Sequence, residues 1–381
     1  MGSAMSSVEG FRTAVRDWLR DRLDGEFAAL RGCGGPGREH EAFDERLTWE
    51  RHMAAHGWTC LGWPEEYGGR GASIEEQVAF HEEYALADAP ARVNHIGEQL
   101  LGPTLIAHGT AEQKARFLPP IRSVTELWCQ GYSEPGAGSD LAGVRTRAAL
   151  DGDTWVLNGR KTWTSLAHVS QWCFVLARTG PGSRGHAGLS YLLVPMDQPG
   201  VEVRPITQLT GTSEFNEVLF DGARTHSSHV VGAPGDGWRM AMATLGFERG
   251  VSTLGHQVGF RRELEALITL ARRNGALGDP LIRDRLVRAW SGLEALRAGA
   301  LRGTDPSAAK LSWSHWHRDL GELAMVVCGA AATVTGAPRA LDRWQRLFLF
   351  SRADTVYAGS SEIQRNIIAE RVLGLPKEPR P

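Results

Sequence analysis

The fold class is decided by the stretch Thr154-Trp155-Val156-Leu157-Asn158-Gly159-Arg160-Lys161-Thr162-Trp163-Thr164-Ser165, which places strand-forming residues in the middle of the chain. β-Branched and aromatic residues flank its Asn158-Gly159 pair, and such a pair between two strands predicts a β-hairpin. Runs of the same character occur at 172–176, 189–194 and 201–203, separated by Gly, Pro, Asp and Asn. We therefore expect residues 127–236 to form an antiparallel β domain.

Helical spacing dominates on both sides of this region. In residues 1–126, apolar residues recur every three or four positions, and Ser73 with Glu76 and Thr110 with Gln113 are typical helix starts. After Gly237 long segments with few breakers predict about four helices that pack as a bundle over residues 237–381. The prediction is an α+β protein of three domains, and the segregation of helices from strands argues against a doubly wound nucleotide-binding fold.

Composition limits the kinds of partner. The 381 residues are 42% hydrophobic and 23% charged, with a formal net charge of −2, which is typical of a globular protein and gives no basic field for nucleic acid. No apolar stretch reaches the roughly 18–20 residues of a membrane span. The cysteines are scattered singly, so we expect reduced thiols in a cytoplasmic protein.

The first candidate binding segment covers residues 128–142, with the sequence WCQGYSEPGAGSDLA. It predicts a strand that breaks into a glycine-rich turn, where a ligand can approach the backbone closely. The hydroxyls of Ser133 and Ser139 could hold a polar ring edge or a phosphate. The spacing does not fit the GxGxxG dinucleotide motif, and an ordinary turn explains the composition equally well.

Two further segments have the same ambiguity. At residues 157–165 the indole of Trp163 and the hydroxyls of Thr164 and Ser165 offer a flat apolar face beside polar atoms, although Trp163 could equally be a core residue. At residues 354–366 a small-residue loop opens the last helix, and its N–H groups could bind a polar ligand, although Ser360 or Ser361 could simply cap that helix.

Taken together and in this order, the three segments resemble the acyl-CoA dehydrogenase family. The loop at 63–71 and the ending at 366–376 resemble that family too, so the similarity covers nearly the whole chain. The resemblance implies an N-terminal helical domain, a middle β domain and a C-terminal four-helix bundle. It also implies bound FAD, which would lie between the β domain and the bundle.

The resemblance implies roles for individual residues. The cofactor-binding positions it transfers are Gln130, Tyr132, Ser133, Gly138, Ser139, Trp163, Thr164, Ser165, Ser360 and Glu362. The substrate-binding positions it transfers are Ser139, Arg249, Ala358 and Gly359.

The position of the catalytic base departs from the usual pattern. Dehydrogenation needs a carboxylate to take the α proton, and many relatives carry a Glu where this chain has Ala358. A subset resembling isovaleryl-CoA dehydrogenase places that Glu on the helix that opens the C-terminal domain, where this chain has Glu248. The neighbours Leu245 and Phe247 suggest a partly apolar setting that would raise its pKa. We therefore expect Glu248 to be the base, although a structural helix Glu is the alternative.

Other departures concern the adenine end of the cofactor and the assembly. The Arg-x-x-Phe-Gly stretch of many relatives, which reaches the FAD of a neighbouring subunit, is not found, and Thr225-His226 replaces a usual Val-Pro. Relatives that act on bulky substrates such as steroid side chains, some as mixed heterotetramers, show comparable losses. We expect a homodimer or homotetramer, with a heterotetramer as the alternative, and an electron-transferring flavoprotein as the electron acceptor.

Three functional interpretations stay open. The leading one is oxidation of an acyl thioester, carried by CoA or by a carrier protein, to its trans-2-enoyl form. The second is a flavin oxidase or monooxygenase on the same fold, and the third is a non-catalytic subunit that completes a partner's site. No metal is expected, because His52 and His56 are four residues apart but lack the Glu of the HExxH pattern and any further ligand nearby.

Overall fold

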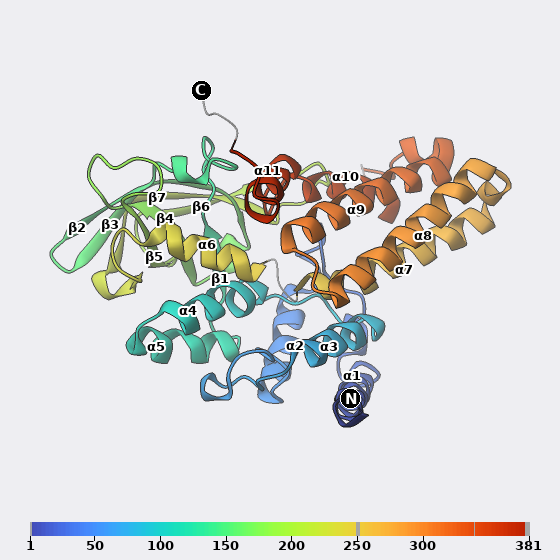
Figure 1. The fold of residues 1–381 in the computed structure, drawn as a ribbon, viewed down its shortest axis with the longest axis horizontal. Coiled ribbons are helices and arrows are strands. Elements are labelled where there is room, and N and C mark those ends of the chain that lie inside the picture. The colour runs from blue at the N-terminus through green and yellow to red at the C-terminus, as the bar shows by residue number, and fades with distance from the viewer. Residues whose placement is uncertain (1, 249–251, 339, 378–381) are drawn as a thin grey trace. The chain divides into compact units, whose positions relative to one another are not determined.

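The computed structural model describes residues 2–248, 252–338 and 340–377, which divide into two compact units. The first unit contains Met1–Phe80 and Ala87–Glu248, and the second contains His81–Leu86 and Arg249–Pro381. The chain passes between them within helix α3 (Ile74–Leu86) and again after helix α6 (Gly237–Glu248) (Figure 1). Contacts therefore group α6 with the first unit, although the expected domain boundary at residue 237 would place it with the bundle; the three domain ranges stay a prediction.

The helical part of the first unit begins with α1 (Gly2–Leu23) and α2 (Phe43–Ala55), and it continues after α3 with α4 (Gly102–His108) and α5 (Ala111–Arg122). Both expected helix starts are confirmed. Thr110 and Gln113 form a capping box ahead of α5. Ser73 and Glu76 exchange the same pair of backbone-to-side-chain bonds ahead of α3, at 3.3 and 2.8 Å.

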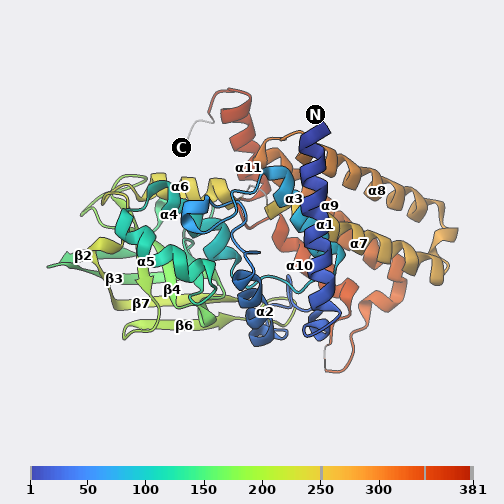
Figure 2. The ribbon, with the colours of Figure 1, turned by 90° about the horizontal axis from the view of Figure 1, so that it is seen from below.

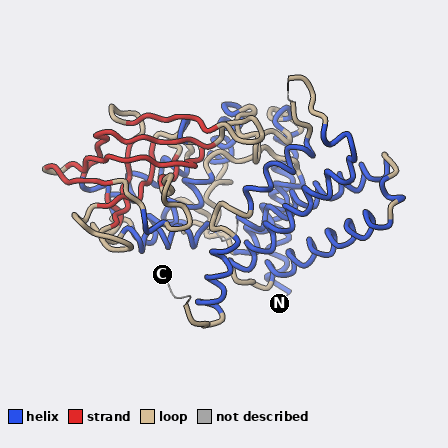
Figure 3. The backbone as a smooth tube through the Cα atoms, turned by 90° about the horizontal axis from the view of Figure 1, so that it is seen from above, coloured by secondary structure: helices blue, strands red, loops and turns tan. Residues whose placement is uncertain are grey.

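The strands form one sheet in the order β6-β7-β3-β2-β4-β5-β8, with β1 beside β4. Figure 3 shows the strands in red, gathered in one part of the chain. Their bounds are β1 Trp128–Gly131, β2 Arg147–Asp151, β3 Thr154–Ser165, β4 Trp172–Arg178, β5 Leu189–Pro195, β6 Val201–Ile206, β7 Phe215–His226 and β8 Val230–Val231. Most pairs are antiparallel as expected, but β1 and β2 both pair with β4 in parallel. The parallel pairs were not expected, because short strands give no sign of their relative direction.

Both faces of strands β4 and β5 are buried. Phe174 and Leu176 of β4 belong to a core shared with α4, α5 and α6, whereas Cys173, Val175 and Ala177 belong to a second core with β3 and β7. This alternation follows the two-residue period of a strand. Figure 2 shows α4, α5 and α6 lying along the strands, so helix α6 is held against the same sheet that carries the first two candidate binding segments.

The expected hairpin at Asn158-Gly159 is wrong. Strand β3 runs without interruption from Thr154 to Ser165, and the chain reverses instead at Asp151-Gly152-Asp153, where Gly152 has φ +62°. The Asn158 side chain accepts a hydrogen bond at 3.0 Å from the N–H of Gly222, the extra residue of a β-bulge in β7. Because β3 is paired along both edges, the local turn preference of Asn-Gly is overridden by tertiary pairing.

The second unit contains α7 (Ser252–Arg273), α8 (Pro280–Leu301), α9 (Pro306–Cys328), α10 (Arg343–Asp354) and α11 (Ser361–Ile367). Leu264, Leu267, Leu286, Leu320 and Leu323 form the centre of its core. The expected helical bundle is confirmed. The breaks expected near residues 275–280, 304–306 and 336–338 lie between these helices.

Gly159 gives a direct test of the corrected β3. A Cβ atom there would lie 2.4 Å from Thr146 Oγ1 and 2.7 Å from Thr146 Cα, at a φ of +157°. We predict that Gly159→Ala lowers the free energy of unfolding of the first unit by about 1–3 kcal/mol, measured by urea denaturation. Gly10→Ala, in α1 with nothing within 4 Å, is the matched control and should be neutral or slightly stabilising. Equal stability of Gly159→Ala and the wild type would contradict this description of β3.

Candidate functional site

The glycine-rich segment leaves β1 as a tight turn. Glu134 and Ala137 exchange two backbone hydrogen bonds of 3.0 Å around Pro135-Gly136. Before the turn, Tyr132 is buried and both Gln130 and Ser133 are half-buried; after it, Gly138 and Ser139 are exposed. The turn therefore exposes hydroxyl and backbone groups while its first residues are embedded in the core.

The turn is fixed by an ion pair that the sequence analysis did not find. The Lys161 side chain is fully buried, and its ammonium group donates to Glu134 Oε1 at 2.8 Å, to the Tyr132 carbonyl at 3.0 Å and to the Leu176 carbonyl at 2.7 Å. All three N–H donors are thus used. This one side chain joins β3, β4 and the glycine-rich turn.

The Glu134 carboxylate is equally well satisfied. Besides Lys161, it accepts from the backbone N–H of Arg145 at 2.6 Å and of Thr146 at 2.9 Å. Burial acts to raise the pKa of Glu134, but Lys161 and these N–H donors outweigh it, so the pKa lies below its usual value. Burial lowers the pKa of Lys161, and Glu134 opposes that shift. A lysine inside an otherwise strand-forming run was the only sequence signal for this pair.

A β-bulge directs Trp163 outward. The register of β3 against β7 shifts between Lys161 and Thr164, and Trp163 has φ +58°. The N–H of Thr162 donates to the Ser133 carbonyl at 2.9 Å, so the bulge lies directly against the glycine-rich turn. The indole is 57% exposed, which excludes the alternative of a core tryptophan, and it contacts Phe215 edge-on with ring centroids 6.0 Å apart.

The two hydroxyls after Trp163 differ in access. Thr164 is fully buried, and its Oγ1 has no hydrogen-bond partner in the described part of the chain, while its carbonyl accepts from Asn216 at 3.1 Å. Ser165 is half-buried at the end of β3. Ser165 is therefore better placed than Thr164 to present a side-chain hydroxyl at the surface.

Within the second unit, the loop between α10 and α11 presents unpaired N–H groups. Ala358 and Gly359 have φ values of +52° and +90°. Their carbonyls accept from the Gln364 side chain at 2.9 and 3.3 Å, but neither N–H has a partner among the described residues. Consecutive N–H groups in such a conformation favour an oxygen ligand.

The serine after this loop has a capping role. Ser360 is the N-cap of α11, and its hydroxyl accepts from the Ile363 N–H at 3.4 Å, as the alternative interpretation expected. Glu362 is exposed in the first turn of α11. The third segment thus belongs to the second unit, whereas the first two segments are joined within the first unit.

Helix α6 is anchored by buried hydroxyls. Thr244 Oγ1 lies 2.9 Å from Thr104 Oγ1 of α4 and 3.4 Å from the Tyr191 hydroxyl of β5. Burial raises the pKa of Tyr191, so its hydroxyl stays protonated and can serve in this chain of hydrogen bonds.

Glu248, the expected base, is the last residue of α6, four positions after Thr244. Of its expected apolar neighbours, Leu245 packs against the core and Phe247 is 38% exposed. The Glu248 side chain and the whole of Arg249 lie outside the described residues.

The histidine pair noted in the sequence is part of an aromatic cluster. The rings of His52 and His56 are 4.3 Å apart, and both lie against Trp18. Burial lowers the pKa of His52. The described residues contain no group of side chains that could hold a metal ion, and none of their helices is long and apolar enough to cross a membrane.

Comparison with protein families gives three matches in chain order. Residues 7–125 match the model of the acyl-CoA dehydrogenase N-terminal domain, residues 129–223 that of the middle domain, and residues 235–373 that of the C-terminal domain. Together they cover most of the chain.

Individual relatives agree. The chain is 67% identical over 383 residues to acyl-CoA dehydrogenase IpdE1 of Mycobacterium tuberculosis, covering 98% of this chain and 99% of that protein. Among solved structures it is similar to the Tcur3481-Tcur3483 steroid ACAD, with a TM-score of 0.83, 30% identity and 98% of both chains covered. It is also similar to the ChsE4-ChsE5 complex of Mycobacterium tuberculosis, with a TM-score of 0.81, 31% identity and 98% of both chains covered.

The buried ion pair can be tested by removing one partner. We predict that Lys161→Met lowers the free energy of unfolding of the first unit by about 3–5 kcal/mol in urea, because the Glu134 carboxylate is left buried without its cation. The double variant Glu134→Gln with Lys161→Met should recover part of this loss.

The matched control is Arg160→Met, one residue earlier on β3. Arg160 is half-exposed and its ion pair with Glu217 is 3.8 Å long, so the change should cost under about 1 kcal/mol. A Lys161→Met protein no less stable than this control would show that the buried pair does not hold the turn.

Proposed function

Because the chain belongs to the acyl-CoA dehydrogenase family of FAD-dependent oxidoreductases, we propose that it removes two hydrogens from the α and β carbons of an acyl thioester. The product is the trans-2-enoyl thioester. The observation that carries this proposal is the exposed indole of Trp163, set by a β-bulge directly against the Ser133 turn. An exposed indole held rigidly beside hydroxyl and N–H groups suits a flat, polar-edged ring.

The residues on the first unit fit FAD. Trp163 offers the stacking face, and Ser133, Ser139 and Ser165 offer hydroxyls that are at least partly exposed. The orphaned hydroxyl of Thr164 is a further polar atom that lacks a partner within the described chain. FAD, when bound, supplies the acceptor for the β hydrogen as hydride.

Glu248 is the proposed base that takes the α proton. Ala358 stands at the position where many relatives carry the carboxylate, and a methyl group cannot accept a proton. Glu248 ends a helix whose preceding turn is fixed by the bonds of Thr244 to Thr104 and Tyr191. A well-anchored helix holds a terminal carboxylate within the narrow range of positions that proton transfer needs.

The loop at Ala358 and Gly359 is the proposed site for the thioester oxygen. Loss of the α proton moves negative charge onto that oxygen, and unpaired N–H groups stabilise such charge where it develops. Substitution of Glu by Ala at position 358 leaves this backbone role intact. Ser139 and Arg249 are proposed to contact the CoA part of the substrate.

We further propose that the working enzyme is an oligomer. The relatives whose solved structures are 30–31% identical carry two-protein names, one of them described as a complex and another as a steroid ACAD. A mixed assembly with a second chain would supply the Arg-x-x-Phe-Gly contact to FAD that this chain lacks, and a bulky acyl group is the substrate class to test first. The electrons would pass to an electron-transferring flavoprotein in the cytoplasm.

A non-catalytic role is the second candidate, favoured by Ala358 and by the missing Arg-x-x-Phe-Gly stretch. The visible spectrum of the purified protein separates the functions. A yellow protein bleached by an acyl-CoA without oxygen is a dehydrogenase, and one that consumes oxygen to hydroxylate is a monooxygenase. A protein that stays colourless, alone and with FAD added, is a partner subunit.

For the base, we predict that Glu248→Gln slows flavin reduction by the best acyl thioester at least about 10²-fold, because general-base catalysis typically contributes 10²–10⁴-fold. Flavin content should not change, since the amide keeps the size of the side chain. The control is Glu265→Gln, an exposed glutamate of α7, which should reduce at the wild-type rate. Near-normal reduction by Glu248→Gln in stopped-flow measurements would refute the assignment.

For the flavin-binding face, we predict that Trp163→Ala retains less FAD per subunit after gel filtration, because the stacking surface is lost. Trp290→Ala is the matched control, since Trp290 of α8 is 51% exposed and lies outside the three motif segments. Equal flavin content in the two variants and the wild type would leave Trp163 without a binding role.

A further inference from the structure

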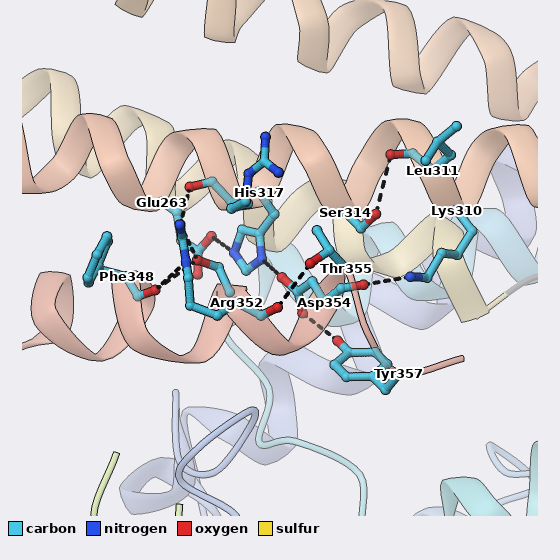
Figure 4. Close-up of polar contacts among 12 residues, drawn as sticks. Glu263, Lys310, Leu311, Ser314, His317, Phe348, Arg352, Asp354, Thr355 and Tyr357 are labelled. Atoms are coloured by element: carbon cyan, nitrogen blue, oxygen red, sulfur yellow. Dashed lines mark hydrogen bonds and ion pairs between the residues drawn. The ribbon is translucent and has the colours of Figure 1, made fainter. Parts of the chain in front are cut away.

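Asp354, the last residue of α10, is held from three directions immediately before the Ala358 loop (Figure 4). One carboxylate oxygen lies 2.5 Å from His317 Nδ1, and the other accepts the Tyr357 hydroxyl at 2.5 Å. The backbone carbonyl accepts from the buried Lys310 ammonium at 2.6 Å. The side chain is 2% exposed, so these protein groups replace solvent around it.

His317 of α9 bridges two carboxylates. Its Nδ1 faces Asp354, and its Nε2 lies 3.0 Å from Glu263 Oε2 of α7 (Figure 4). Since an ionised carboxylate only accepts hydrogen bonds, both ring nitrogens must donate, which requires the imidazolium form. Burial acts to lower the pKa of His317, but Asp354 and Glu263 outweigh it and raise the pKa to about 9.

We propose that Glu263, His317 and Asp354 are positioning residues that hold the Tyr357–Gly359 loop in the conformation that presents the N–H groups of Ala358 and Gly359. The structural link is Tyr357, which precedes Ala358 and is tied to Asp354 by its hydroxyl. Ala358 has a left-handed conformation that is unfavourable for any residue other than glycine, so its surroundings must enforce it. The use of those N–H groups in catalysis rests on the proposed function.

The charged groups that surround the His317 imidazolium determine what its deprotonation would do. Glu263 faces it from α7, and Asp354 faces it from the end of α10. Lys310, on the same helix as His317, contacts the Asp354 carbonyl, and Arg352 of α10 is bonded to Glu322 at 2.8 Å. Phe260 covers the ring at 4.5 Å between centroids.

Loss of the imidazolium charge would leave the carboxylates of Glu263 and Asp354 without the cation between them. The hydrogen bond from His317 to Asp354, which orients Asp354 toward Tyr357, would then weaken.

The sign of the pH dependence follows from the raised pKa. The ordinary pKa of histidine is near 6.5 and that of His317 in the fold is about 9. The stabilisation is therefore fully present below about pH 6.5 and is lost as the pH rises through about 9. Order in the loop should be lost over the same range.

The test is amide hydrogen exchange of Val356 and Tyr357, whose N–H groups donate to the Ala353 carbonyl at 2.8 and 3.0 Å, measured by mass spectrometry on the flavin-loaded protein from pH 6 to 10. After correction for the intrinsic exchange rate, protection in the wild type should fall about tenfold between pH 8 and 10, as a group with a pKa near 9 requires. His317→Gln should show low protection with no step. Asp354→Asn and Glu263→Gln, which keep side-chain shape, should move the step to lower pH.

Asp319→Asn is the matched control, an exposed carboxylate of α9 paired with Arg318, and it should behave as the wild type does. Flavin reduction by an acyl-CoA should fall with the same midpoint as the loop protection, at unchanged flavin content. A protection profile without a step in the wild type, or a step that persists in His317→Gln, overturns the proposal. So does a step that flavin reduction does not follow.

Failure of the proposed function would look different. If no acyl-CoA reduces the flavin of the wild type at any pH, the dehydrogenase assignment fails. The exchange profile would still decide whether His317 and Asp354 hold the loop.

Discussion

The ion pair between Lys161 and Glu134 is the contact on which the candidate flavin surface depends. Both charged groups are buried. The Lys161 ammonium also donates to the carbonyls of Tyr132 and Leu176, and the Glu134 carboxylate also accepts from backbone N–H groups of residues 145–146. Burial of a charge is tolerated only with such complete pairing. The result is that a glycine-rich turn, which has little rigidity of its own, is held against β3 and β4.

The bulge in β3 follows from the same contact. Lys161 must point into the core to reach Glu134, while Trp163, two residues later, points outward. Regular alternation would place both on one face of the strand, so the register shift after Lys161 separates an inward cation from an outward indole. The stability of the glycine-rich turn and the exposure of the Trp163 indole therefore both depend on residues 161–163.

In the second unit, too, buried charged side chains lie behind a loop that carries candidate binding groups. The loop at Ala358 and Gly359 has no carboxylate at these two positions, and what it offers is a pair of backbone N–H groups. Backbone N–H groups can bind a ligand only if the loop conformation is held in place. The buried charged groups of Glu263, His317 and Asp354 lie behind the loop and are proposed to hold it. Glu248 of α6 is the proposed base, and the proposed site for the thioester oxygen still needs an ordered loop.

The sequence by itself determined the order of helical and β regions, the helix starts at Thr110 and Ser73, and the three motif segments, because periodicity, capping and turn composition are local properties. It did not determine that Asn158-Gly159 lies within a continuous strand, since pairing on both edges of β3 overrides a local turn preference. It also left open whether Trp163 is exposed, and it gave no cation to pair with Glu134 or with Asp354. These depend on contacts between residues 27 to 54 positions apart, and only the tertiary structure brings such residues together.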